Sequence, residues 1–223
     1  MTLPRRVEAV VFDMDGLLVD TETVYRDVMM EVSARRGWPL PLSVFLRMVG
    51  APREQNRKVV EEHFGLEFPF DDWFDEVGSL AHARIAVEVS LKTGVVELVD
   101  HLEALRIPRA VATSSSHHAV ELQLGPSGLT RRFQTIVAAG DYVRGKPNPD
   151  PFLTAAARLG VDPAACLALE DSHNGVRAAH AAGMMTIMVP DLLEATSEMR
   201  SLCVAVEDTL HGVRALLEAQ AAS

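Results

Sequence analysis

Five short apolar runs, separated by helical patterns, limit the folds open to this chain of 223 residues. The runs cover residues 7–12, 109–113, 135–138, 166–169 and 186–189. Each has the length of one buried strand, and the first is rich in valine, as a strand covered on both faces requires. Helical patterns cover 94–105, 150–160 and 172–183, with Ser172 as a predicted N-cap and Gly160 and Gly183 as predicted stops. This alternation predicts a parallel sheet with right-handed crossovers, which is an α/β core.

Residues 17 to about 90 interrupt the alternation, because they show one helical pattern after another, over 21–36, 52–64 and 71–88. Such a segment cannot lie within the sheet. We therefore expect a discontinuous α/β core of residues 1–16 and 93–223, with an all-α cap domain of residues 17–92 inserted after the first strand. Four aromatic residues are expected to form the core of this cap: Phe68, Phe70, Trp73 and Phe74.

The first apolar run ends in two aspartates, Asp13 and Asp15, ahead of Gly16. Ligands of open α/β sheets bind beyond the carboxyl ends of the strands. Residues two apart on a strand face the same side, so the two carboxylates repel each other unless a positive charge lies with them. Mg²⁺ prefers such oxygens, and one aspartate could then be ligand and nucleophile while the other acts as acid and base. On this spacing alone, a helix-capping carboxylate beside a solvated one remains an alternative.

Polar residues also follow the later strands. Thr113 precedes three serines, Lys146 opens "KPNPDPF", and Glu170 and Asp171 end the fourth run. Hydroxyls and backbone N–H groups at a strand-to-helix turn suit phosphate oxygens, and a lysine supplies the charge that a phosphoryl group needs. Helix capping by serine and a solvated lysine are the structural alternatives. Because these polar residues follow one strand after another, we favour a single phosphoryl-transfer site over the separate structural roles.

Four ordered segments, "VFDMDGLLVD", "VATSSS", "GKPNPDPF" and "LEDSHNGVRAAHAAGM", resemble the motifs of the haloacid dehalogenase superfamily. The resemblance covers essentially the whole chain. It is strongest to the subgroup with a helical cap inserted after the first motif, which contains small-molecule phosphatases and beta-phosphoglucomutase. It implies a parallel sheet core of Rossmann-like topology with the inserted all-α cap.

The resemblance implies roles for the acidic residues. Asp13 would attack phosphorus and become an aspartyl phosphate, and Asp15 would act as general acid and then as general base. Asp13 and the backbone carbonyl of Asp15 would bind Mg²⁺ together with Asp171, and Glu170 would help directly or through water. The presence of Asp15 argues against the dehalogenases of the superfamily, which resemble this pattern only without the second aspartate.

The same resemblance implies that Thr113 and the backbone N–H of Ser114 hold phosphoryl oxygens, and that Lys146 pairs with both the phosphate and Asp13. These roles agree with the interpretation from the residues, because phosphoryl transfer depends mostly on positioning and charge neutralisation.

The cap should select the substrate, with Glu22, Tyr25 and Arg53 as candidate contacts. Arg53 could clamp a second phosphate or a carboxylate, or it could be an ordinary surface arginine. The mutases have a histidine where Tyr25 stands, which favours a Mg²⁺-dependent phosphatase of a small phosphorylated metabolite, such as a sugar phosphate. A phosphomutase remains the alternative. A catalytically silent binding protein should have lost Asp13, Asp15, Lys146 or Asp171, and all are present.

The net charge of −10, with no cluster of Lys and Arg in the sequence, disfavours nucleic acid and anionic membranes as partners. No apolar stretch approaches the ~20 residues of a membrane span, and we recognise no leader peptide. Cys166 and Cys203 belong to no metal-binding pattern and are expected to be buried free thiols. We expect a cytoplasmic protein and a monomer.

Overall fold

The computed structural model describes residues 3–49, 51–88 and 90–221. The chain divides into two compact units, of which the first contains Met1–Val19 and Leu91–Ser223, and the second contains Asp20–Ser90. We call them the core unit and the helical unit. Within the core unit, Val19 pairs with Leu91 in an antiparallel bridge, and the backbone N–H of Lys92 donates to the carbonyl of Leu18 at 3.0 Å. The segments that leave and re-enter the core unit are therefore hydrogen-bonded to each other.

A parallel sheet of six strands forms the centre of the core unit within the described residues, in the order β3-β2-β1-β4-β5-β6. The strands are β1 (Ala9–Phe12), β2 (Arg109–Ser116), β3 (Thr135–Ala139), β4 (Cys166–Glu170), β5 (Met185–Met188) and β6 (Ala205–Val206). The predicted α/β class and parallel sheet are confirmed. The sequence did not predict β6, because two residues are too few to form a recognisable pattern.

The register brings the ends of three strands together. Phe12 of β1 is paired with Val111 of β2 on one side and with Leu169 of β4 on the other. Asp13 therefore follows β1 at the level where β4 ends in Glu170. The chain passes from β1 to β2 on one side, while β4 lies on the other side, and such a point in an α/β sheet is where ligands bind.

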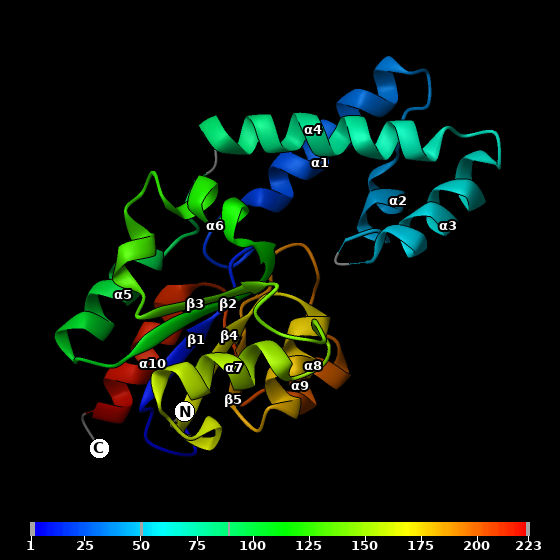
Figure 1. Ribbon diagram of the computed structural model, residues 1–223. Helices are drawn as coiled ribbons and strands as arrows, with labels where there is room; N and C mark the ends of the chain where they lie inside the picture. Colours follow the sequence, from blue (N-terminus) through cyan, green and yellow to red (C-terminus); the bar gives the residue numbers. More distant parts are fainter. Residues whose placement is uncertain (1–2, 50, 89, 222–223) are drawn as a thin grey trace. The chain divides into compact units, whose positions relative to one another are not determined.

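Helices α7 (Asp150–Leu159) and α8 (His173–Ala181) pack on the sheet, α7 against β1 to β3 and α8 against β4 and β5 (Figure 1). Small residues of the strands, such as Ala9 and Ala168, form a buried cluster with Phe152 of α7. Helices α5 (Val95–Ala104) and α10 (Leu210–Ala221) pack against each other. Shorter elements are α6 (His117–Leu124), α9 (Ser197–Leu202), η1 (Leu129–Arg132) and η2 (Pro163–Ala165).

The predicted helix ends of the core unit are confirmed where the structure tests them. The hydroxyl of Ser172 accepts a hydrogen bond from the N–H of Gly175 at the start of α8. Gly160 ends α7 with a φ of 71°, in the left-handed region that favours glycine. Gly183 follows α8 with a φ of 78°. Local sequence therefore sets where these helices begin and end.

The helical unit contains α1 (Thr21–Arg35), α2 (Leu42–Leu46), α3 (Arg53–Phe64) and α4 (Phe70–Glu88), and α1 and α4 run side by side (Figure 1). Phe68, Phe70 and Trp73 are buried, as predicted, and Phe74 is half-buried. The indole Nε1 of Trp73 donates to the hydroxyl of Ser33 at 2.9 Å. An aromatic cluster thus supplies this unit with its own core.

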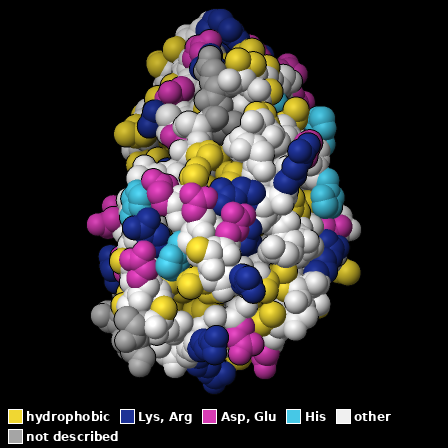
Figure 2. All heavy atoms as spheres, turned by 90° about the vertical axis from the view of Figure 1, so that its left-hand side faces the viewer, with side chains coloured by type: hydrophobic (Ala, Val, Ile, Leu, Met, Phe, Trp, Pro, Cys, Tyr) yellow, Lys and Arg dark blue, Asp and Glu magenta, His cyan; other side chains and the backbone are white. Residues whose placement is uncertain are grey.

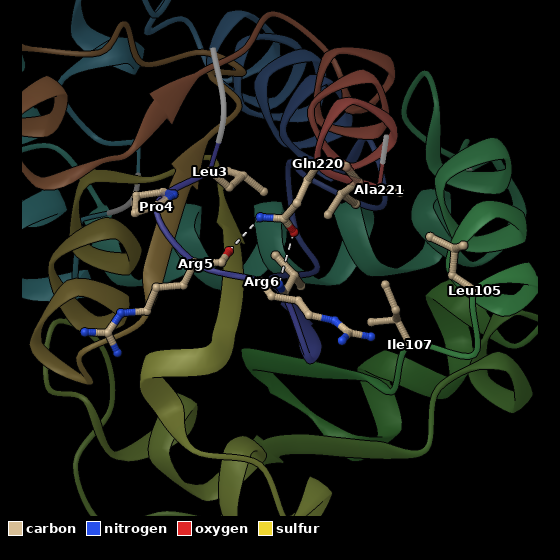
Figure 3. Close-up of a pocket in the computed structure, with 10 residues that line it drawn as sticks. Leu3, Pro4, Arg5, Arg6, Leu105, Ile107, Gln220 and Ala221 are labelled. Carbon is tan, nitrogen blue, oxygen red and sulfur yellow. Dashed lines mark hydrogen bonds between the residues drawn. The ribbon is translucent and has the colours of Figure 1, made fainter. Parts of the chain in front are cut away.

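A cavity of about 600 Å³ lies before the amino ends of β1 and β2 (Figure 3), whereas Asp13 follows the carboxyl end of β1. Figure 3 shows Gln220 of α10 beside the segment of residues 5–7, to which it is hydrogen-bonded. Its Oε1 accepts from the N–H of Val7 at 3.1 Å, and its Nε2 donates to the carbonyl of Arg5 at 2.7 Å. The ends of the described chain are therefore tied to each other.

The surface carries charges of both signs. On the face that Figure 2 shows, side chains of Lys and Arg lie among those of Asp and Glu. Among the described helices, none combines the length and the apolar character that a membrane crossing demands. Both cysteines are free thiols, as expected, and Cys166 is buried; Cys203 is only half-buried, which differs from the expectation.

Candidate active site

Asp13 lies one residue beyond β1 and is almost completely buried. Its backbone N–H still donates to the carbonyl of Leu169 at 3.0 Å, so the pairing with β4 fixes its position. Its side chain is 10% exposed, and Oδ1 lies 2.5 Å from Nζ of Lys146. A buried carboxylate is stable only beside a compensating charge, and Lys146 supplies it here.

Lys146 comes from the turn between β3 and α7, and its ammonium group contacts two carboxylates. Nζ lies 2.5 Å from Oδ1 of Asp13 and 2.5 Å from Oε1 of Glu170, and the side chain is 7% exposed. Nζ also lies 5.0 Å from the centre of the Phe152 ring. Burial acts to lower the pKa of Lys146, but the charges of Asp13 and Glu170 outweigh it and raise that pKa. The lysine therefore stays charged between its partners.

Glu170 ends β4 and is fully buried. Its Oε1 accepts from Lys146, and its Oε2 accepts from the backbone N–H of Ser172 at 3.3 Å and from its hydroxyl at 3.0 Å. Burial raises the pKa of Glu170, while Lys146 and the N–H of Ser172 act in the opposite direction. A Cβ atom at Gly175 would collide with the Glu170 carboxylate, so only glycine fits at this point of α8.

Asp13, Glu170 and Asp171 form a group that could hold a metal ion, because one oxygen from each lies within 4.8 Å of the others. Asp13 and Glu170 both contact the single ammonium group of Lys146, so these two carboxylates carry more negative charge than that lysine neutralises. An all-oxygen, anionic set of ligands suits a hard divalent cation such as Mg²⁺. Gly16 belongs to this arrangement, because it has a φ of 82° and a Cβ there would collide with Oδ2 of Asp171. The residues present therefore fit the predicted metal.

Asp15 is held by the segment that ends β2. The hydroxyl of Ser115 donates to Oδ2 of Asp15 at 2.7 Å, and the hydroxyl of Thr113 lies 3.5 Å from the same oxygen. Thr113 is fully buried and its hydroxyl accepts from the N–H of Ser115 at 3.0 Å, whereas Ser114 is exposed. The structure thus brings Asp15 and Thr113 together and adds Ser115 to them.

Two residues of this site were not singled out from the sequence. Ser115 could have been found, because β2 continues to Ser116 and alternation along a strand places Thr113 and Ser115 on the same side. Tyr142 gave no such signal. Its hydroxyl donates to the backbone carbonyl of Thr113 at 3.1 Å and so fixes the end of β2 from the turn after β3.

The other predicted residues belong to the helical unit. Glu22 and Tyr25 lie in the first turns of α1, and the hydroxyl of Tyr25 is 3.3 Å from Nε2 of His82. The guanidinium group of Arg53, at the start of α3, donates to Asp75 at 2.8 Å and to Asp71 at 2.9 Å. Arg53 therefore already has two carboxylate partners on α4.

A family model described as haloacid dehalogenase-like hydrolase matches residues 7–183, which include Asp13, Asp15, Thr113, Lys146 and the carboxylates that end β4. The chain belongs to this family. A haloacid dehalogenase-like hydrolase was the class predicted from the four motifs, and the match confirms it.

Curated relatives of this haloacid dehalogenase-like hydrolase include proteins that are named as phosphatases. A Drosophila melanogaster protein named "Probable pseudouridine-5'-phosphatase" is 37% identical over 194 residues, which are 84% of this chain and 83% of that protein. The Escherichia coli fructose-1-phosphate phosphatase YqaB is 32% identical, over 82% of this chain and 97% of its own length. These names and the family support the predicted enzyme class, a phosphoric monoester hydrolase.

Among solved structures, a HAD family hydrolase from Deinococcus radiodurans R1, with bound phosphate and sodium, superposes with a TM-score of 0.83. The sequences are 28% identical, and the superposition covers 96% of each chain. The fold of this haloacid dehalogenase-like hydrolase is therefore that of its family along nearly the whole chain.

Proposed function

We propose that this protein is a Mg²⁺-dependent phosphatase that releases inorganic phosphate from a small phosphorylated metabolite, such as a sugar phosphate. The observation that carries the proposal is the buried carboxylate of Asp13, held at the carboxyl end of β1 by the ammonium group of Lys146 at 2.5 Å. The names of the Drosophila and Escherichia coli relatives support the substrate class, because both name small phosphorylated metabolites.

Asp13 is the proposed nucleophile. Lys146 holds Oδ1, and we assign the attack on phosphorus to Oδ2. The new bond from Oδ2 to phosphorus forms as the bond from phosphorus to the leaving oxygen breaks, which gives an aspartyl phosphate and an alcohol. The charge of Lys146 fixes the orientation of the carboxylate before the substrate arrives, so little reorganisation is needed during the reaction.

Asp15 is the proposed general acid and base. It gives its proton to the leaving oxygen in the first step. In the second step it takes a proton from the water that attacks phosphorus, and the bond from phosphorus to Asp13 then breaks and releases phosphate. The hydroxyl of Ser115, at 2.7 Å, holds the Asp15 carboxyl in place for both transfers. Thr113 and the N–H of Ser114 bind the phosphoryl oxygens in this scheme.

Mg²⁺ would be held by Asp13, the backbone carbonyl of Asp15 and Asp171, and it would neutralise charge on the phosphoryl oxygens. Glu170 would join this set directly or through water, and the hydrogen bonds that both of its carboxylate oxygens accept from Lys146 and Ser172 favour the contact through water. Glu170 then serves to place Lys146.

Residues 17–92 act as the substrate-selecting cap in this proposal, with Glu22 and Tyr25 as substrate contacts. Arg53 was a candidate clamp for a second phosphate, but its ion pairs with Asp71 and Asp75 count against that role. A phosphomutase, in which a sugar hydroxyl replaces water as the attacking group, stays the alternative. The monomeric state and the cytoplasmic localisation of the protein also stay predictions.

The proposal is tested by incubating the purified protein with Mg²⁺ and a panel of phosphorylated sugars and other metabolites and measuring inorganic phosphate. Asp13→Asn should abolish the release, whereas Asp100→Asn, at an exposed ion pair with Arg132, should not change it. Release that persists in Asp13→Asn contradicts the mechanism. No release, combined with isomerisation of beta-glucose 1-phosphate in the presence of a bisphosphate primer, identifies a phosphomutase instead.

A further inference from the structure

Asp191 follows β5 in the core unit, the unit that also contains the proposed metal ligands. The backbone N–H of Val189 donates to the carbonyl of Glu170 at 2.7 Å, so the chain leaves β5 beside the end of β4. The side chain of Asp191 is 12% exposed, and its Oδ1 lies 2.6 Å from Nζ of Lys92. A lysine therefore neutralises one oxygen of this carboxylate.

The second oxygen of Asp191 has no such partner. Oδ2 is buried, and none of the described residues donates a hydrogen bond to it. Buried polar atoms nearly always have a partner, so an exception indicates a water molecule or an ion that the protein holds at that point. Because the oxygen belongs to a carboxylate, that partner must be a hydrogen-bond donor or a cation.

Gly16 shows where this oxygen lies. A Cβ atom at Gly16 would lie 2.2 Å from Oδ2 of Asp171 and 3.5 Å from Oδ2 of Asp191, so the two oxygens are no further apart than the sum of these distances. The three carboxylates whose oxygens lie within 4.8 Å of one another are those of Asp13, Glu170 and Asp171. Asp191 therefore borders this group of carboxylates without belonging to it.

We propose that Oδ2 of Asp191 accepts a hydrogen bond from a water molecule bound to Mg²⁺, which makes Asp191 a positioning residue for the metal. Mg²⁺ loses water reluctantly and usually keeps several water ligands in a protein site. The groups that accept hydrogen bonds from metal ligands orient these ligands, and their loss typically costs about 10- to 100-fold in metal affinity. The inference rests on the metal site of the proposed function and adds a residue to it.

Binding of Mg²⁺ to the substrate-free protein tests the inference without an activity assay. Isothermal titration calorimetry of chelator-treated protein should give a Kd for Mg²⁺ that is about 10- to 100-fold higher for Asp191→Asn than for the unmodified protein. The asparagine keeps the shape of the side chain but loses its charge and one of its two acceptor oxygens. An equal Kd for both proteins would overturn the inference.

Asp208→Asn is the matched control for the loss of one negative charge. Asp208 is exposed and lines, together with Gly16 and Lys92, a cavity of about 220 Å³ in the core unit. The same substitution there removes the same charge from the neighbourhood of Gly16, where an exposed charge is screened by salt. The Kd of this variant should change by less than ~2-fold. If Asp208→Asn weakens binding as much as Asp191→Asn does, charge alone explains the effect and the inference is wrong.

Lys92→Met separates the metal role of Asp191 from its ion pair. If Asp191 served only to hold Lys92, both Lys92→Met and Asp191→Asn should raise the Kd for Mg²⁺ alike. Under the inference, Lys92→Met keeps Oδ2 and removes a positive charge near the metal, so the Kd should stay the same or fall. A rise of about tenfold or more in Lys92→Met would contradict the inference. Should Asp191→Asn fail to fold, the Kd of Lys92→Met decides alone.

The same titrations separate this inference from the proposed function. If the unmodified protein does not bind Mg²⁺, or if Asp171→Asn leaves the Kd unchanged, the proposed metal site is wrong and the inference fails with it. If binding of Mg²⁺ depends on Asp171 but not on Asp191, the metal site stands and only the inference is rejected.

Discussion

The ammonium group of Lys146 lies 2.5 Å from Oδ1 of Asp13, although the two residues are 133 positions apart in the sequence. The same ammonium group lies 2.5 Å from Oε1 of Glu170. One buried cation therefore joins the end of β1, the end of β4 and the turn after β3. Without it, two buried carboxylates would face each other with no positive charge between them.

Replacement of this cation should damage both stability and activity. We expect Lys146→Met to lower the free energy of unfolding by about 3–5 kcal/mol, because it leaves buried charges unpaired. It should lower kcat/KM by at least ~100-fold, because the charge that orients Asp13 is lost. Urea unfolding and phosphate release measure the two effects. Arg144→Met, at an exposed pair with Asp150, is the control and should change neither strongly.

The glycine beneath Glu170 should tolerate no side chain. Gly175→Ala would push a Cβ into the Glu170 carboxylate, so we expect a loss of about 1–3 kcal/mol in the free energy of unfolding and a lower kcat. Gly78→Ala, in α4, meets no atom within 4 Å and should be neutral or stabilising by up to about 1 kcal/mol. Thermal unfolding compares the two variants, and equal melting temperatures would contradict the prediction.

The metal should be detectable without an activity assay. Mg²⁺ added to chelator-treated protein at about 100 times its Kd should raise the melting temperature by about 5 °C, since binding to the folded state stabilises it. Asp171→Asn should abolish most of this shift, whereas Asp100→Asn should retain it. An unchanged melting temperature of the unmodified protein over a wide range of Mg²⁺ concentrations would show that the carboxylates do not form the site.

Asp141, beyond the end of β3, should contribute stability that depends on pH. Its hydrogen bond with Arg158, together with the N–H of Ala138 and the ring of His117, lowers its pKa from 3.8 to about 2. The folded state thus favours the ionised form, so this contribution is present above about pH 4 and is lost as the pH falls toward about pH 2. Asp141→Asn should lower the melting temperature at about pH 6 by a few degrees. The deficit should shrink as the pH falls from about 5 to about 3, and a constant deficit would contradict the assignment.

Much of the core could be predicted, because each strand carries its own pattern. The predicted runs at 109–113 and 166–169 start at the first residues of β2 and β4. The first run was predicted to start at Val7, but ladder pairing begins at Ala9, because apolar composition does not show where a neighbouring strand starts. Strand β6 is defined only by its pairing with β5, which no local pattern reveals.

The site, like the fold, could be predicted from the sequence only in part. The carboxyl ends of parallel strands must share one edge of the sheet, which is why Asp13, Lys146 and Glu170 could be expected together. The double contact of Lys146 and the use of both Glu170 oxygens depend on side-chain positions that the motifs leave open. The pairing of Arg53 with Asp71 and Asp75 also needed the structure, because α3 and α4 must first pack before these charges can meet.

The bridge between Val19 and Leu91 has a consequence for the evolution and engineering of this fold. Since the core unit holds the two ends of the inserted segment next to each other, the segment closes a loop whose ends stay fixed whatever its length or sequence. A foreign helical module grafted between these two residues would leave the strand register and the contacts of Lys146 intact. Under the proposed function, in which this segment selects the substrate, exchange of the segment alone could change the substrate while Asp13 and Lys146 keep their positions.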